Sequence, residues 1–299
     1  MVKMTWRTVV LTKDSKISLR LNHLVIMSDE MTTIPLSEIG QVVIDNPNIV
    51  MTGHILNALS QNKITTIICN NKHMPFSHLN LIYGHFRQVM AIKKQLSWTP
   101  LRKDMLWQHI IKHKINNQKR TLNTFYQNSP YDNFDSYIKQ VELGDETNRE
   151  GHAAKVYFNQ LFGLGFIRGE DTPINWGLNY GYSLLLSLFT KIITTKGLLT
   201  EVGIHHRNQY NHYNLASDFM EVYRPVIDII VKSHITVEFD TAEKQELLDV
   251  FNKKVRIKNK NQYLANSVEI YVDSLISYMD SGDVKRLAFP TLIGAEVNV

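Results

Sequence analysis

The chain has 299 residues, 43% of them hydrophobic, and carries a formal net charge of +5. This length allows a sizeable core and two domains, and the composition argues against an unfolded chain. The opening residues contain no uninterrupted apolar run and Cys69 is the single cysteine, so we expect no secretory signal and a cytoplasmic protein. The most apolar later run, 182–199, is interrupted by Lys191 and Lys196, so we expect a buried helix and no membrane partner.

Residues 1–78 predict a small β-rich domain, packed as a sandwich or compact barrel. Short β-branched runs separated by polar pairs predict strands at 7–11, 16–19, 23–26, 42–44 and 64–69. Asn22 and His23 predict a tight hairpin between the second and third of these strands. A single short helix is expected at 52–61, where apolar residues recur at helical spacing.

Residues 79–299 predict a larger all-α domain, so the fold class is α+β. Apolar residues recur at helical spacing from Tyr83 onward, and Gly197 closes the longest apolar helix. On the helix that carries Glu150, the expected buried side is Ala154, Phe158 and Leu161. Helices at 243–252 and 263–279 are expected to flank a basic loop, 253–260. The last eleven residues, from 289, predict a loose tail.

Basic residues gather in two segments. Nine lie in residues 87–120, where Asp104 is the only acid, and five more lie in 253–260 without any acid. Such clustering is typical of proteins that bind polyphosphates, and Trp98 and Trp107 in the first segment suit stacking on bases. A solvated helix face explains either segment alone, whereas the two together favour a nucleic-acid partner.

Residues 203–228 contain two adjacent histidines followed by two acids. Asp218 and Glu221 stand at i and i+3, so they share one face of a helix. Glu150 stands at the start of another helix, which Thr147 or Asn148 can cap. If these segments meet, Glu150, His206 and Glu221 can bind one divalent ion.

Two carboxylates favour magnesium, and the histidine shifts the preference toward manganese. Asp218 can bind the ion directly or hold a metal-bound water. From spacing alone the simpler readings stay open: a helix-dipole role for Glu150, surface pairing of the acids with Arg224 or Lys155, and an ordinary loop histidine at His206. No glycine-rich nucleotide-binding loop or GxSxG motif is present.

Three separated motifs resemble the Cas1 family of CRISPR-associated integrases. They are NREGHAA at 148–154, GIHH at 203–206 and NLASDFMEVYRPVID at 214–228, and the segments 175–182 and 6–10 add to the likeness. The likeness is closest to variants from type II-A systems. It implies that residues 1–78 form a β-rich dimerisation domain and that residues 79–299 form a helical domain that is catalytic and binds metal and DNA.

The resemblance implies Glu150, His206 and Glu221 as ligands of Mg²⁺ or Mn²⁺, with Asp218 as the accompanying catalytic acid. His206 is preferred to His205 because the family motif usually ends in one histidine at that place. The implied DNA-binding residues are Arg207, Arg224, Lys191, His205, Arg87, Lys93 and Lys94.

The implied reaction is transesterification: the 3′-hydroxyl ends of a short protospacer DNA are joined to the CRISPR repeat. The implied partners are double-stranded DNA, a second copy of the chain, a Cas2 dimer that bridges two such dimers, and Csn2 and Cas9. An endonuclease that hydrolyses branched or single-stranded DNA is the alternative, and a non-enzymatic DNA-binding scaffold is a third hypothesis.

Overall fold

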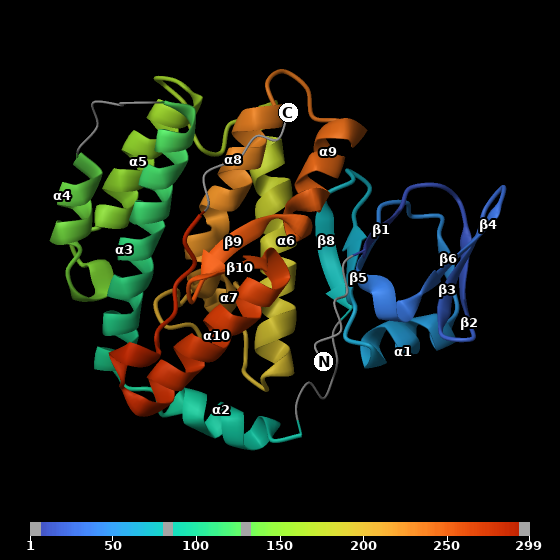
Figure 1. Ribbon diagram of the computed structural model, residues 1–299, viewed down its shortest axis with the longest axis horizontal. Helices are drawn as coiled ribbons and strands as arrows, with labels where there is room; N and C mark the ends of the chain where they lie inside the picture. The colour runs from blue at the N-terminus through green and yellow to red at the C-terminus, as the bar shows by residue number, and fades with distance from the viewer. Residues whose placement is uncertain (1–6, 80–85, 127–132, 293–299) are drawn as a thin grey trace. The chain divides into compact units, whose positions relative to one another are not determined.

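The computed structural model describes residues 7–79, 86–126 and 133–292. The chain divides into two compact units, residues 1–82 and residues 83–299. The first unit is built mainly from strands (blue to cyan in Figure 1) and the second mainly from helices (teal to red). The predicted α+β class, with a β-rich part before a larger helical part, is therefore confirmed.

Within its described residues, the β unit consists of two four-stranded sheets and one helix. In the first sheet, β1 and β7 both run parallel to the central β5, and β8 pairs antiparallel with β7; the second sheet is ordered β4-β3-β2-β6. One cluster of buried side chains, which includes Val9, Ile17, Leu24 and Ile55, draws on both sheets and the helix. The unit is therefore a sandwich. Its elements are β1 (Arg7–Leu11), β2 (Lys16–Arg20), β3 (His23–Met27), β4 (Met31–Pro35), β5 (Ile39–Ile44), β6 (Val50–Met51), α1 (Gly53–Gln61), β7 (Thr65–Cys69) and β8 (Pro75–Leu79).

The sequence analysis does not predict β4, β6 or β8, and for β4 and β8 the reason is identifiable. The first three residues of β4 are exposed, and β8 contains proline, serine and histidine, so neither strand shows an apolar alternation. The predicted hairpin between β2 and β3 is confirmed, with its turn one residue earlier, at Leu21 and Asn22. Both turn residues have positive φ, 47° and 59°, as a tight hairpin turn with a right-handed twist requires.

Two long helices, α3 and α6, organise the helical unit. The first packs against α4, α5, α8 and α10, and the second against α7, α8, α9 and α10, so α8 contacts both long helices. The helices are α2 (Gln88–Leu96), α3 (Pro100–Phe125), α4 (Asn133–Gln140), α5 (Arg149–Phe162), α6 (Pro173–Thr195), α7 (Asn214–Met220), α8 (Arg224–His234), α9 (Thr241–Leu248) and α10 (Leu264–Ser281).

Glycines let α6 and α8 approach closely. A Cβ atom on Gly181 would lie 2.4 Å from Ile227, and one on Gly177 would lie 2.3 Å from Ile235. Real side chains do not tolerate such distances without a shift, so larger residues here would push the two helices apart. This close packing holds α8 against α6 along its length.

The helical unit departs from the all-α prediction in its last third. The expected basic loop is a hairpin of β9 (Lys254–Ile257) and β10 (Lys260–Tyr263). Val255 and Ile257 are buried and alternate with exposed basic residues. Residues 254–257 therefore follow the alternation of buried and exposed side chains that is typical of a strand. The described part of the expected loose tail is also ordered, because Thr291 pairs with Arg256 and Leu292 is buried. Residues 293–299 lie outside the described part.

One helix face is also shifted from its predicted position. On α5 the buried residues are Ala153, Tyr157 and Leu161, instead of a face that includes Ala154 and Phe158. In the described parts of the chain, no helix combines the length and the apolarity that crossing a bilayer requires.

Candidate active site

Glu150 is fixed at the start of α5 by two caps. Asn148 has left-handed backbone, with φ 50°, and its side chain accepts a hydrogen bond from the backbone N–H of Gly151 at 3.1 Å. Asp145 accepts hydrogen bonds from the backbone N–H groups of Arg149 and Glu150, each at 2.9 Å. The predicted capping by Asn148 is thus confirmed, and these caps set the direction in which the Glu150 side chain leaves the helix.

Glu221 opens the one-turn 3₁₀ segment Glu221–Tyr223 between α7 and α8. Its side chain is 4% exposed, and its Oε1 lies 2.9 Å from Nε of Arg224 in an ion pair. The guanidinium of Arg224 also lies over the ring of Tyr182, 4.7 Å from its centre. Burial raises the pKa of the Glu221 carboxyl, but the cations of Arg224 and Lys114 outweigh burial and hold the pKa below its usual value.

The two glutamates converge on Lys114 of α3. Its Nζ donates hydrogen bonds to Glu150 Oε1 and to Glu221 Oε2, each at 2.5 Å. The two carboxylate oxygens therefore lie no further apart than twice this distance. Burial lowers the pKa of the Lys114 ammonium, but the two carboxylates outweigh burial, so the pKa is raised and the side chain stays charged.

Asp218, which is fully buried on α7, holds the loop that carries the two histidines. Its Oδ2 accepts the backbone N–H groups of Ile204 at 2.7 Å and His205 at 3.0 Å. Its Oδ1 accepts the backbone N–H of His206 at 3.0 Å and contacts Nδ1 of the same residue at 2.5 Å. This last hydrogen bond raises the pKa of His206 and leaves Nε2 as the ring nitrogen that can bind a metal.

The two histidines have different surroundings. The ring of His205 stacks on Trp107 of α3, with ring centres 4.2 Å apart and planes 5° from parallel. His206 instead meets Trp107 edge-on. The carboxylates of Glu221 and Glu150 raise the pKa of His206, although less than Asp218 does, which places His206 in their electrostatic neighbourhood.

The loop leaves no room for a side chain at Gly203. A Cβ there would lie 2.5 Å from the backbone oxygen of His206 and 2.7 Å from Asp218 Oδ2. We therefore expect Gly203→Ala to lower the free energy of unfolding by about 1–3 kcal/mol, because neither the backbone nor the buried carboxylate can yield. Chemical denaturation measures this loss. Gly53→Ala, where nothing lies within 4 Å of the added Cβ, is the control, and equal stability of the two variants would contradict the expectation.

The donor set of Glu150, Glu221 and His206 fits a divalent ion in its chemistry, because two carboxylates converge on a cation and the histidine is oriented by a carboxylate. In the parts of the chain that the structure describes, however, no three His, Cys, Asp or Glu side chains are gathered closely enough to hold a metal ion. Lys114 lies between the two carboxylates instead. The sequence contained one signal for this lysine: it follows Ile110 and Ile111 at helical spacing on the buried face of α3.

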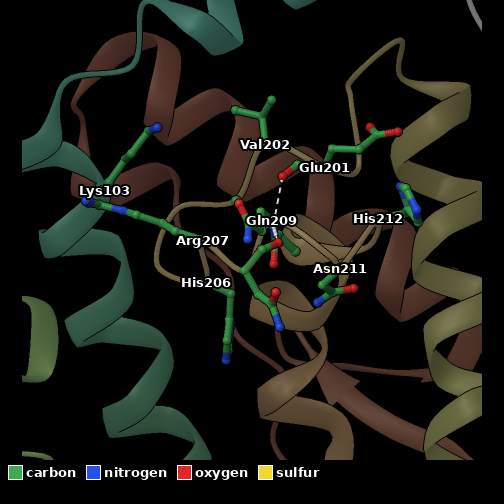
Figure 2. A pocket seen from close by; sticks show the side chains of 11 residues that line it. Lys103, Glu201, Val202, His206, Arg207, Gln209, Asn211 and His212 are labelled. Carbon is green, nitrogen blue, oxygen red and sulfur yellow. Dashed lines mark hydrogen bonds between the residues drawn. The ribbon is translucent and has the colours of Figure 1, made fainter.

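Three of the seven predicted DNA contacts, His205, Arg207 and Arg224, belong to the candidate site or to the loop beside it. Arg207 lines a cavity of about 390 Å³ together with Lys103, His206 and residues of the 208–214 segment. Figure 2 shows Arg207 extending toward Lys103, while His206 leaves the same loop in another direction. Burial, followed by the charge of Arg207, lowers the pKa of Lys103. The structure thus adds Lys103 to the basic residues beside the candidate site.

The other predicted contacts lie elsewhere. Arg87, Lys93 and Lys94 belong to α2 or its N-cap, and Lys94 pairs with Asp280 at 3.1 Å. Lys191 lies on α6, nine residues beyond Tyr182, or about 13 Å along the helix axis.

The expected base-stacking role of the two tryptophans is wrong. Trp98 is 6% exposed and Trp107 is 1% exposed, so both belong to the core of the helical unit. Trp107 lies on the buried face of α3, and Trp98 lies in the connection between α2 and α3.

Solved structures define the class of the fold. A casposase bound to integration product has a TM-score of 0.70 to this chain, with 18% sequence identity over 93% of this chain and 92% of the casposase. A Cas6-RT-Cas1–Cas2 complex gives a TM-score of 0.72 at 19% identity, over 99% of this chain and 37% of the other. The fold is therefore that of the Cas1 and casposase structures.

The sequence comparisons establish the family. The family model described as CRISPR associated protein Cas1 matches residues 8–259. The CRISPR-associated endonuclease Cas1 of Neisseria meningitidis serogroup C (strain 8013) is 29% identical over 296 residues, which is 97% of each chain. The chain belongs to the Cas1 family, as its three motifs indicate. The likeness to type II-A variants stays a prediction.

Proposed function

We propose that the protein is an integrase of CRISPR adaptation. It would join the 3′-hydroxyl ends of short protospacer DNA to the CRISPR repeat by metal-dependent transesterification. One observation carries this proposal: in a chain of the Cas1 family, Glu150 and Glu221 converge on a single cation. The fold shared with a casposase bound to integration product supports strand joining as the class of reaction.

Glu150, Glu221 and Nε2 of His206 would hold the metal, Mg²⁺ or Mn²⁺. When bound, the ion would lower the pKa of the attacking hydroxyl and neutralise charge on the phosphate. Asp218 fixes the tautomer and direction of the His206 ring through Nδ1. Arg224 orients Glu221 by their ion pair. These contacts prepare the site before DNA arrives, and such positioning supplies much of the acceleration of phosphoryl transfer.

Basic residues beside the site would hold the DNA backbone. Arg207 and Lys103 line the cavity next to His206, where their charges suit phosphate oxygens. His205, from the same loop as His206, and Arg224, at the start of α8, are further candidate contacts to the DNA backbone. Arg87, Lys93 and Lys94 on α2, together with Lys191, would follow the backbone of the fragment at a greater distance.

The proposed partners follow the same reasoning. The likeness to a complex that contains Cas1 and Cas2 supports a Cas2 dimer that bridges two dimers of this chain. Dimerisation through residues 1–78 and assistance from Csn2 and Cas9 are proposed from the resemblance to type II-A proteins.

A hydrolytic endonuclease is the second candidate, and the name of the Neisseria relative, an endonuclease, favours it. The same carboxylates serve both reactions, and only the nucleophile differs. The assay follows a labelled repeat duplex on a gel, in the presence of the protein, Cas2 and a short DNA fragment. We expect a fragment with a 3′-hydroxyl end to be joined to the repeat, and a fragment with a 3′-deoxy end not to be joined. Excess chelator should stop the joining, and manganese should restore it at least as well as magnesium.

The control is the same assay without any fragment. Equal breakage of the repeat by both fragments would overturn the integrase in favour of the hydrolase. Joining that is undiminished in excess chelator would remove the metal from the mechanism.

A further inference from the structure

Lys114 occupies the position between the two acids to which the proposed function assigns the metal. Its ammonium makes 2.5 Å contacts with both Glu150 and Glu221, and its side chain is only 9% exposed. A buried lysine is costly to place unless it is paired, and here it is paired twice. The two ion pairs of Lys114 are therefore an integral part of the site.

The charges of this cluster are balanced. Glu150 and Glu221 contribute two negative charges, and Lys114 and Arg224 contribute two positive charges. A divalent ion added to this set would leave two uncompensated positive charges and would meet the ammonium at contact distance. Such an excess is unfavourable here, because Lys114 and Glu221 are largely buried and water screens their charges poorly. The ammonium and the metal therefore compete for the same carboxylate oxygens.

The side chain of Lys114 can move away from the two carboxylates. Its flexible four-carbon stem lets the ammonium swing away while α3 stays in place. Arg224 contacts the other oxygen of Glu221, Oε1, so this carboxylate keeps one cationic partner during the exchange.

We propose that Lys114 is a built-in counter-ion, which holds Glu150 and Glu221 together without metal and which a divalent ion displaces. The inference rests on the proposed function, because it takes the metal to bind at these carboxylates. It assigns Lys114 a positioning role that sets how much metal the site requires. Removal of the ammonium has two consequences: the metal-free site loses its counter-ion, and the metal loses its competitor.

The test is Lys114→Met, which keeps an unbranched side chain that is one atom shorter and removes its charge. We expect Mn²⁺ to bind the full-length variant at least about tenfold more tightly than the wild type in isothermal titration calorimetry without DNA. In chelator the variant should melt at a lower temperature than the wild type. Saturating Mn²⁺ should raise the melting temperature of the variant by more than it raises that of the wild type. If Lys114 were purely structural, Lys114→Met would lower the melting temperature without increasing the affinity for Mn²⁺.

Lys196 provides a matched control. It also joins two acids, Glu269 at 3.2 Å and Asp273 at 2.7 Å, but its partners lie on the exposed side of α10. Lys196→Met should leave the Mn²⁺ affinity unchanged. Because Lys114→Met is at risk of failing to fold, a structure of the wild type with Mn²⁺ provides a second test, in which Nζ of Lys114 should be out of hydrogen-bond reach of at least one carboxylate.

The outcomes separate this inference from the proposed function. Suppose that the wild type binds Mn²⁺, that Glu150→Gln does not, and that Lys114→Met binds it no more tightly than the wild type. This result would overturn the counter-ion role alone and leave the metal site in place. An ammonium that keeps both contacts in the Mn²⁺ structure would do the same. If neither the wild type nor Lys114→Met binds Mn²⁺, the metal site of the proposed function falls as well.

Discussion

Glu150→Gln is expected to reduce strand joining by about a thousandfold or more, equivalent to ~4 kcal/mol of transition-state stabilisation. Glutamine has the shape of glutamate, and the caps at Asn148 and Asp145 do not involve the side chain that is replaced. The change therefore removes a charge without disturbing the start of α5. Single-turnover joining of a labelled fragment measures the effect.

DNA binding by Glu150→Gln should stay close to that of the wild type, because its basic surfaces are unchanged; fluorescence anisotropy measures this. Glu146→Gln is the matched control, since Glu146 is exposed and lies four residues earlier, in the turn before α5. Joining by Glu150→Gln within about tenfold of the wild-type rate would support the scaffold hypothesis instead of the enzyme. A parallel loss of joining and DNA binding would show that Glu150 acts through the fold.

Much of the fold was predictable because its main signals are local. The hairpin of β2 and β3 and the Asn148 cap of α5 depend on residues close in sequence, and these predictions are confirmed. The hairpin of β9 and β10 was missed because basic residues fill the exposed positions of β9, and a period-2 pattern is hard to recognise when only Val255 and Ile257 carry it.

The candidate site was predictable only in part. The spacing of Asp218 and Glu221 indicated a shared helix face, but α7 ends at Met220 and Glu221 begins a tighter turn, so the two acids have different partners. Asp218 contacts the histidine loop, whereas Glu221 contacts Lys114 and Arg224. The pairing of Lys114 with two acids that are distant in sequence depends on tertiary packing, which no local pattern reports.

Asp218→Asn is expected to lower the free energy of unfolding by about 3–5 kcal/mol and to abolish joining. Each carboxylate oxygen of Asp218 accepts a backbone N–H and a second donor: the N–H groups of Ile204 and His205 at Oδ2, and the N–H and Nδ1 of His206 at Oδ1. An asparagine must place its NH₂ group on one side or the other, where it meets donors in either orientation. The result is buried donors without acceptors, and a loop that no longer orients His206.

The same substitution at Asp228 provides a control, because the partners there are different. Asp228 is also buried, but it accepts hydrogen bonds from the hydroxyl groups of Tyr157 and Tyr182, which can turn and accept from an amide. Burial also raises the pKa of Asp228 to about 6, so a neutral side chain is easily accommodated. We expect Asp228→Asn to change the free energy of unfolding by less than about 1 kcal/mol. Equal losses in the two variants under chemical denaturation would show that burial alone, and not the four donors around Asp218, determines the cost.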